Sequence, residues 1–141
     1  MEISLIRHGK SKHIENDWIT CTEFQDWIQN YDSNGVLEEN YYPSVTLEKI
    51  AAANIVFTSD LSRSIESASL LNQHVRIISD DLFRETELPT FPRLFGLKLS
   101  PNIWAIILRC LWLIGYSRQC ESLVHAKQRA KQASEQLVKY A

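Results

Sequence analysis

The sequence predicts an α/β fold with a mainly parallel sheet, and three features support this prediction. Two short β-prone runs, residues 54–58 and 75–78, are each long enough for one buried strand. Between them, residues 61–72 carry apolar side chains along one helical face. A strand, a helix and a second strand at this spacing indicate a right-handed crossover between parallel strands. Because 141 residues is the length of one domain, residues 1–141 are expected to form a single unit.

Before this unit, the sequence predicts a strand and two helices. Residues 2–6 are a short β-prone run that ends at an Arg-His-Gly sequence. Residues 20–31 have apolar side chains spaced by 3, 1 and 3 positions, which is typical of an amphipathic helix. The turn cluster Asp-Ser-Asn-Gly follows at residues 32–35, and Pro43 interrupts the chain again. Residues 46–53 are predicted to form a short helix.

The remaining elements are predicted from capping residues and helical spacing. Ser59 and Asp60 have side chains that commonly cap helices, so they are predicted to cap the helix over residues 61–72. A long final helix is predicted over residues 117–140, where apolar residues recur at spacings of 3 and 4. The alternation of strands and helices predicts a further strand after this helix.

Composition and charge argue against several functional classes. Hydrophobic residues make up 45% of the chain and charged residues 23%, as in ordinary globular proteins. The formal net charge of -2 offers no basic field for DNA or RNA, so no nucleic-acid partner is expected. Cys21, Cys110 and Cys120 are scattered, which favours buried thiols at the last two positions over a metal site. No signal peptide is recognised, and a reducing, cytoplasmic setting is expected.

The segment from Ile103 to Ile114 is apolar at every position except Arg109. As a helix it would reach only ~18 Å, well short of the roughly 30 Å of a bilayer core, so no membrane association is expected. It is predicted to be a buried helix, or one that covers an active site or a partner subunit. In the last case, the expected contact is a homodimer through Ile103–Ile114. Aromatic residues nearby suggest an apolar lid: Phe91, Phe95 and Trp104.

The first run with chemical meaning is Leu-Ile-Arg-His-Gly-Lys-Ser at residues 5–11, which follows the first predicted strand. Open α/β proteins bind ligands at this carboxyl edge of the sheet. The neutral imidazole of His8 is a nucleophile, the guanidinium of Arg7 offers a planar charged fork to phosphate oxygens, and Gly9 lets the backbone approach a ligand closely. Taken alone, a histidine beside a chance arginine would explain the run equally well.

A second run follows the strand at residues 54–58. The sequence Thr-Ser-Asp-Leu-Ser-Arg-Ser-Ile-Glu-Ser-Ala spans residues 58–68 and puts Arg63 in the first turn of a predicted helix. The N-terminus of a helix favours anions, so a cation there is slightly unfavourable unless an anion binds beside it. Arg63 is therefore a candidate anion ligand, with a solvated arginine as the alternative.

Together, the two runs resemble the histidine phosphatase superfamily, the phosphoglycerate-mutase-like proteins of branch 1, in their order and separation. The resemblance covers nearly the whole chain. It implies a three-layer sandwich with a mainly parallel sheet, and a phosphatase that hydrolyses phosphomonoesters or phosphohistidine. The partner implied is a small phosphorylated substrate or a phosphoprotein, and the implied mechanism uses no metal and no cofactor.

The resemblance also implies a role for each residue of the site. His8 matches the family nucleophile that carries the phosphoryl group, and Arg7 and Arg63 match the arginines that hold its oxygens. The family's acid protonates the leaving alkoxide and lies shortly after the third strand, in a Leu-Arg-Glu-like context. The run Asp-Leu-Phe-Arg-Glu fits this context, so Glu85 is the candidate acid and Glu87 the second choice, with a surface glutamate as the alternative.

The sequence departs from the family in one element, a second histidine at the end of a late apolar strand. The remaining histidines, His13, His74 and His125, do not lie in that context. We therefore expect a domain without its C-terminal strand and one pocket wall, with low or absent phosphatase activity. Residues 10–14 do not reproduce the run typical of the mutases, which includes an acidic residue and a later Asn, and this favours a phosphatase. The alternative function is a non-catalytic phosphate-binding or interaction module.

Overall fold

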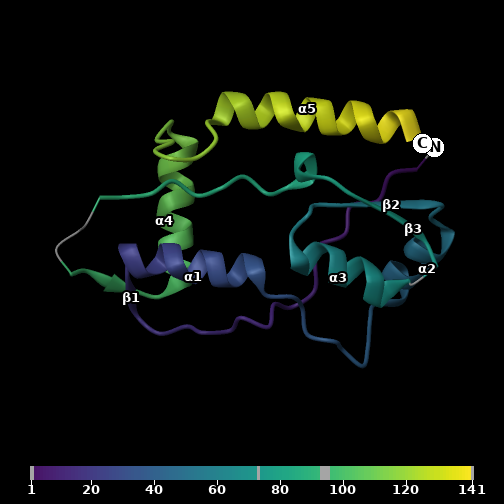
Figure 1. The fold of residues 1–141 in the computed structure, drawn as a ribbon, viewed down its shortest axis with the longest axis horizontal. Coiled ribbons are helices and arrows are strands. Elements are labelled where there is room, and N and C mark those ends of the chain that lie inside the picture. The colour runs from purple at the N-terminus through teal and green to yellow at the C-terminus, as the bar shows by residue number, and fades with distance from the viewer. Residues whose placement is uncertain (1, 73, 93–95, 141) are drawn as a thin grey trace.

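The structure is a computed structural model that describes residues 2–72, 74–92 and 96–140 (Figure 1). Within these residues the fold is mixed α/β, with five α-helices, one 3₁₀ turn and two sheets of two strands each. In chain order the elements are β1 (Ile19–Thr20), α1 (Cys21–Ser33), α2 (Ser44–Ala52), β2 (Ile55–Thr58), α3 (Ser62–Leu71), β3 (Arg76–Ser79), the 3₁₀ turn η1 (Asp81–Phe83), β4 (Lys98–Leu99), α4 (Pro101–Leu113) and α5 (Leu123–Tyr140).

The predicted parallel unit is confirmed. β2 pairs with β3 in parallel, with Val56 opposite Ile77, and α3 connects the two strands. Figure 1 places this pair between α5 on one side and α2 with α3 on the other. On the α5 side, the Phe57 ring lies 5.2 Å from the Tyr140 ring, measured between centroids. The carboxyl ends of both strands therefore lead into loops at the same edge of the sheet.

The strand predicted over residues 2–6 is absent. This segment forms no backbone hydrogen bond with another part of the described chain, and Leu5 is 91% exposed. A β-prone run becomes a strand only where a neighbour supplies matching backbone groups, and β2 is paired on one edge alone, with β3. The first backbone pairing comes later, where Ser11 forms an isolated antiparallel bridge with Val36.

The position of α1 is fixed by its cap and by its buried face. The Thr20 hydroxyl accepts a hydrogen bond from the Glu23 N–H, and the Glu23 carboxylate accepts one from the Thr20 N–H, which together form a capping box. Just before the helix, β1 pairs with β4 in a short antiparallel ladder that the sequence does not predict. On the buried face, Phe24 joins Trp104 and Leu108 of α4 in the hydrophobic core.

The predicted apolar helix, α4, is buried on one face and exposed on the other. Trp104, Leu108 and Trp112 are buried, and the Trp104 indole N–H donates to the Ile19 carbonyl at 2.7 Å. The opposite face carries an apolar stripe of exposed residues, Ile103, Ile106, Ile107, Cys110 and Leu113. Cys110 is exposed rather than buried as predicted, because it belongs to this stripe. Within the described residues, no helix is both long and apolar enough to cross a membrane.

The aromatic lid predicted near α4 is not present as such. Trp104 is a core residue, because its ring packs beneath α1. Phe91 is half-buried, with its ring 5.7 Å from that of Tyr116, and Phe95 lies outside the described residues.

The predicted cap of α3 and the predicted start of α5 are also wrong. The N-cap position of α3 is Leu61, whose apolar side chain forms no cap bond. The Asp60 carboxylate, predicted to cap the helix, binds Arg84 instead. α5 begins at Leu123, later than predicted, and Ala126 is its buried contact. The Asp60–Arg84 contact joins two segments that are distant in the sequence.

Candidate functional site

The His8 imidazole is held in one orientation by its own neighbour. Its Nδ1 atom lies 2.7 Å from the carbonyl oxygen of Gly9. A carbonyl oxygen only accepts hydrogen bonds, so Nδ1 carries the proton and Nε2 carries the free lone pair. The side chain is mostly buried, with 11% of its surface exposed. The chain therefore presents one unprotonated ring nitrogen of His8, Nε2, as a nucleophile.

Two polar groups lie near Nε2 without contacting it directly. The Tyr31 hydroxyl, from the last turn of α1, is 3.5 Å away, and Glu85 Oε1 is 3.8 Å away. Both distances exceed the roughly 2.7–2.9 Å of a good hydrogen bond. The Tyr31 ring meets the imidazole edge-on, with 6.2 Å between ring centroids. The space beside Nε2 is therefore bordered by a hydroxyl group and a carboxylate.

Arg63, in the first turn of α3, is a buried cation at this space, with 4% exposure. Its Nη1 donates to the Asp32 carboxylate, and its guanidinium carbon lies 4.6 Å from the centre of the Tyr31 ring. A buried charge requires such partners to offset its lost hydration, and the end of α1 supplies both. Nη2 lies 3.9 Å from Glu85 Oε2. The Glu85 carboxylate is therefore within 4 Å of the nucleophilic nitrogen and of the arginine.

The segment that carries Glu85 is anchored on both sides, although the Glu85 side chain is 66% exposed. Three arginines hold it: Arg84 binds Asp60, Arg109 binds the hydroxyl and carbonyl of Thr86, and Arg129 binds the carbonyls of Leu82 and Arg84. The hydrogen bonds from Arg84 lower the pKa of Asp60 below its usual value, so this pair stays charged at neutral pH. An exposed side chain on a fixed backbone can turn without moving the rest of the site.

A short hydrogen-bond chain connects the Arg-His-Gly run to α3. The Gly9 N–H donates to the Ser67 hydroxyl at 2.8 Å, and that hydroxyl donates to the Arg63 carbonyl at 2.6 Å. These two bonds fix the backbone beside His8 relative to the helix that carries Arg63. A methyl group in place of the Gly9 hydrogen would meet Val36 and Ser67 at ordinary contact distances, so packing alone does not require a glycine here.

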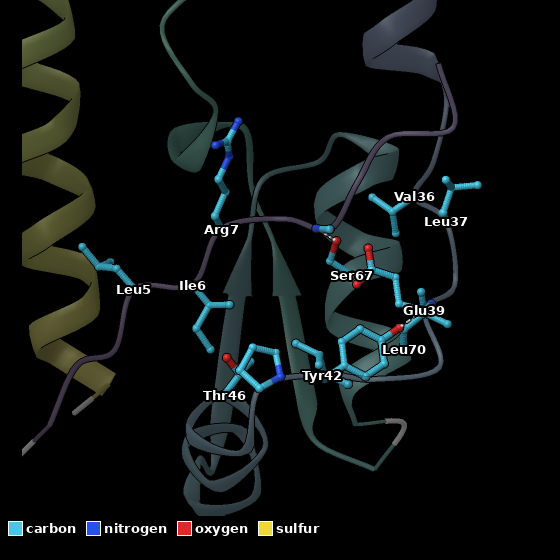
Figure 2. A pocket seen from close by; sticks show the side chains of 13 residues that line it. Leu5, Ile6, Arg7, Val36, Leu37, Glu39, Tyr42, Thr46, Ser67 and Leu70 are labelled. Atoms are coloured by element: carbon cyan, nitrogen blue, oxygen red, sulfur yellow. Dashed lines mark hydrogen bonds between the residues drawn. The ribbon is translucent and has the colours of Figure 1, made fainter. Parts of the chain in front are cut away.

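Arg7 is not brought to the same space. Its side chain is exposed, and within the described residues it forms no hydrogen bond or ion pair. Arg7 lines a hollow of about 380 Å³ between residues 5–9, the loop at residues 36–43, the first turn of α2, and α3. Figure 2 shows its guanidinium pointing away from this hollow, whereas Ile6, Ser67 and Leu70 border it. Of the two predicted arginines, the structure therefore places only Arg63 beside His8 and Glu85.

The other candidate residues stand apart from Nε2. His74, His125 and Glu87 are exposed, and no described hydrogen bond or ion pair joins them to His8. His13 is half-buried with its ring 5.0 Å from that of Trp27, and its Nε2 is buried without a hydrogen-bond partner among the described residues. The described residues also contain no cluster of three or more His, Cys, Asp or Glu side chains that could hold a metal ion.

Three residues of the site, Tyr31, Asp32 and Ser67, are not identified by the sequence reasoning. Ser67 had a usable signal, because it lies four residues after Arg63 and so on the same helical face. Tyr31 and Asp32 had no such signal in the sequence, since only the packing of α1 against α3 brings them to Arg63.

Comparison of the chain with protein-family models, with curated proteins and with solved structures gives no match.

Proposed function

We propose that the chain is a phosphatase of the histidine phosphatase type, which hydrolyses phosphomonoesters or phosphohistidine through a phosphoryl group carried on His8. One observation carries this proposal. The Gly9 carbonyl leaves Nε2 as the free ring nitrogen, and a carboxylate and a buried guanidinium group face the space beside it. A nucleophile, a proton donor and a fixed positive charge are the three groups that phosphoryl transfer requires.

In the first step, the Nε2 lone pair attacks phosphorus and forms a P–N bond while the P–O bond to the leaving group breaks. The electron pair of that bond stays on the leaving oxygen, which takes a proton from the protonated carboxyl group of Glu85. Arg63 stabilises the negative charge on the phosphoryl oxygens. Arg7 would supply a second charge if its exposed side chain turned toward Nε2. With a phosphohistidine substrate, the leaving atom is an imidazole nitrogen and the rest is unchanged.

In the second step, water attacks the phosphorus of phospho-His8 and the P–N bond breaks. The water proton passes to the Glu85 carboxylate, and the electron pair of the P–N bond returns to Nε2. Inorganic phosphate leaves, and both side chains regain their starting states. A single carboxyl group thus acts as the acid in one step and as the base in the next.

The proposal includes the fold of this superfamily, a three-layer sandwich with a mainly parallel sheet. The parallel pair of β2 and β3 supports it, because helices flank this pair on two sides (Figure 1). The placement of Arg63 and Glu85 also supports it, since both lie in segments that follow the carboxyl ends of β2 and β3 and the Glu85 carboxylate reaches His8. A partner of this enzyme would be a small phosphorylated molecule or a phosphoprotein.

The test is phosphorylation of the purified chain by phosphoramidate, with the label located by mass spectrometry. We expect one acid-labile phosphohistidine at position 8 that is absent from His8→Ala and present in the matched control His125→Ala, whose side chain is exposed. Arg63→Met should slow labelling by about 100-fold, because it removes the buried charge that faces the phosphoryl group. A label that survives acid, or that persists in His8→Ala, would contradict the proposal.

The proposed role of Glu85 as the acid is tested with phosphate esters that have different leaving groups. Glu85→Gln should slow phosphoryl transfer from phenyl phosphate by about 100-fold, since this leaving group needs a proton. The same substitution should change transfer from 4-nitrophenyl phosphate much less, because 4-nitrophenolate leaves without one. Glu87→Gln serves as the matched control, and equal losses with both esters would exclude Glu85 as the acid.

A second candidate function is a non-catalytic phosphate-binding or interaction module, and two observations favour it. Arg63 is already bound to Asp32, and the apolar stripe of α4 has no cover within the described residues. In this case, a homodimer through Ile103–Ile114 would bury the stripe. Phosphate binding without labelling, together with a concentration-dependent dimer that Ile106→Asp abolishes, would support the module over the phosphatase.

A further inference from the structure

The last turn of α1 borders the space beside His8 with two consecutive residues, Tyr31 and Asp32, to which the proposed mechanism gives no role. Tyr31 contacts both sides of the site: its hydroxyl lies 3.5 Å from Nε2, and its ring lies 4.6 Å from the Arg63 guanidinium carbon. Asp32 accepts a hydrogen bond from Nη1 of the same arginine. One helical turn therefore reaches both the nucleophile and the buried cation.

The position of Tyr31 is fixed by the core. Its ring stacks on Trp27 with 5.2 Å between centroids, and Trp27 stacks on Phe24 at 5.8 Å. Phe24 is fully buried against Trp104 of α4. Because the three rings lie one or two helical turns apart on α1, the stack runs from the core to the site. The Tyr31 hydroxyl is thus held at a defined place and does not sample many positions.

The hydroxyl has one donor proton, and its distance from Nε2 is too long for a strong hydrogen bond. When phosphorus bonds to Nε2, its oxygens occupy the space between Nε2, Arg63 and Tyr31. Each oxygen is a charged acceptor, which binds a hydroxyl donor more strongly than a neutral nitrogen does. A donor already placed at that distance needs no rearrangement to bind the incoming group.

Asp32 acts on the site through Arg63. Its carboxylate holds Nη1, so the guanidinium plane is fixed with Nη2 3.9 Å from Glu85 Oε2. We propose that the last turn of α1 completes the phosphoryl site, with Tyr31 as a donor to a phosphoryl oxygen and Asp32 as the positioning residue of Arg63. This inference rests on the proposed function of His8.

The direction in which Asp32→Ala changes the affinity for phosphate shows whether Asp32 positions Arg63 or only repels the anion. Removing the Asp32 carboxylate also removes a negative charge next to an anion site, so repulsion alone predicts tighter phosphate binding. Positioning predicts the opposite, because Arg63 loses the bond that orients it. Asp32→Asn should bind phosphate more tightly than Asp32→Ala, since the amide oxygen of asparagine can still accept a hydrogen bond from Nη1 of Arg63.

The experiment is titration of the full chain with inorganic phosphate, followed by the 15N signals of the His8 ring. We expect Tyr31→Phe to weaken phosphate binding about tenfold while its ring stack and unfolding temperature stay unchanged. Asp32→Ala should weaken binding about fivefold or more, and Asp32→Asn should bind nearly as the unsubstituted chain does. The matched controls are Tyr41→Phe and Asp26→Ala, whose side chains are exposed and lie outside the site.

The outcomes distinguish this inference from the function on which it rests. If the unsubstituted chain forms no phosphohistidine at His8, the proposed function fails. If it forms phosphohistidine, but Tyr31→Phe binds phosphate as tightly as the unsubstituted chain, or Asp32→Ala binds it as tightly or more tightly, then only the role of α1 is refuted. Should Asp32→Ala not fold, Tyr31→Phe still decides, because it removes a single oxygen atom and keeps the ring.

Discussion

Truncation to alanine should have very different effects on stability at the two faces of α4. Leu108 is 2% exposed and packs with Phe24 and Trp104 beneath α1. Leu108→Ala removes three carbon atoms and leaves a cavity that rigid aromatic neighbours cannot fill. Such substitutions cost about 3 kcal/mol in well-packed cores, with a range of roughly 2.7–5 kcal/mol. Ile106, on the opposite face, is 64% exposed, so Ile106→Ala should change the free energy of unfolding by less than about 0.5 kcal/mol.

The assay is urea unfolding at low micromolar protein, followed by the fluorescence of the four tryptophans. With a slope of about 2 kcal/mol per molar urea, Leu108→Ala should lower the midpoint by about 1.5 M and leave the slope unchanged. Ile106→Ala should leave the midpoint within about 0.25 M of the unsubstituted value. Equal losses from both substitutions would refute the assignment of the two faces, and so would a neutral Leu108→Ala.

Four further outcomes follow from the remaining contacts. Arg129→Ala should lower the unfolding free energy by about 2 kcal/mol in urea titrations, because it removes hydrogen bonds to Glu121 and to two backbone carbonyls. The hydrogen bonds from Arg129 lower the pKa of Glu121 below its usual 4.5, so the part of this contribution that comes from Glu121 should be complete above about pH 4.5 and be lost as the pH falls through the lowered pKa. The difference between Arg129→Ala and the parent should shrink accordingly, while the part from the two backbone carbonyls remains. Gly35→Ala should lower the thermal midpoint, because its new methyl group would displace the Glu66 carboxylate, which accepts a hydrogen bond from the Val36 N–H. Arg7→Gln should weaken phosphate binding severalfold in the titration of the His8 ring signals.

The elements that the sequence predicts correctly are those set by local patterns. β2, α3 and β3 are found because β-prone runs and one helical stripe alternate over a short stretch. Residues 2–6 have the same local character but remain unpaired, since pairing depends on a neighbour rather than on the run itself. β1 and β4 are too short to leave any pattern, and only the capping box of α1 and the core beneath it bring them together.

The site divides in the same way. The family resemblance implies that His8, Arg63 and Glu85 share one site, and the structure places the Glu85 carboxylate within 4 Å of both His8 and Arg63. The sequence does not indicate which way the Arg7 side chain turns, because an exposed arginine has many rotamers of similar energy. Tyr31 and Asp32 reach Arg63 only through the packing of distant helices.

The charges around Nε2 explain why Arg7 should matter even though it lies apart from the site. Arg63 contributes one positive charge, and the carboxylates of Asp32 and Glu85 together outweigh it. A phosphate dianion therefore meets a site of net negative charge, which a further cation would offset. Turning the exposed Arg7 side chain inward costs rotamer freedom and hydration, so exposed ion pairs are worth only about 1 kcal/mol or less in net terms. A net gain of that size is a severalfold change in affinity. Phosphate binding should therefore draw Arg7 toward His8, and the loss of affinity in Arg7→Gln measures that movement.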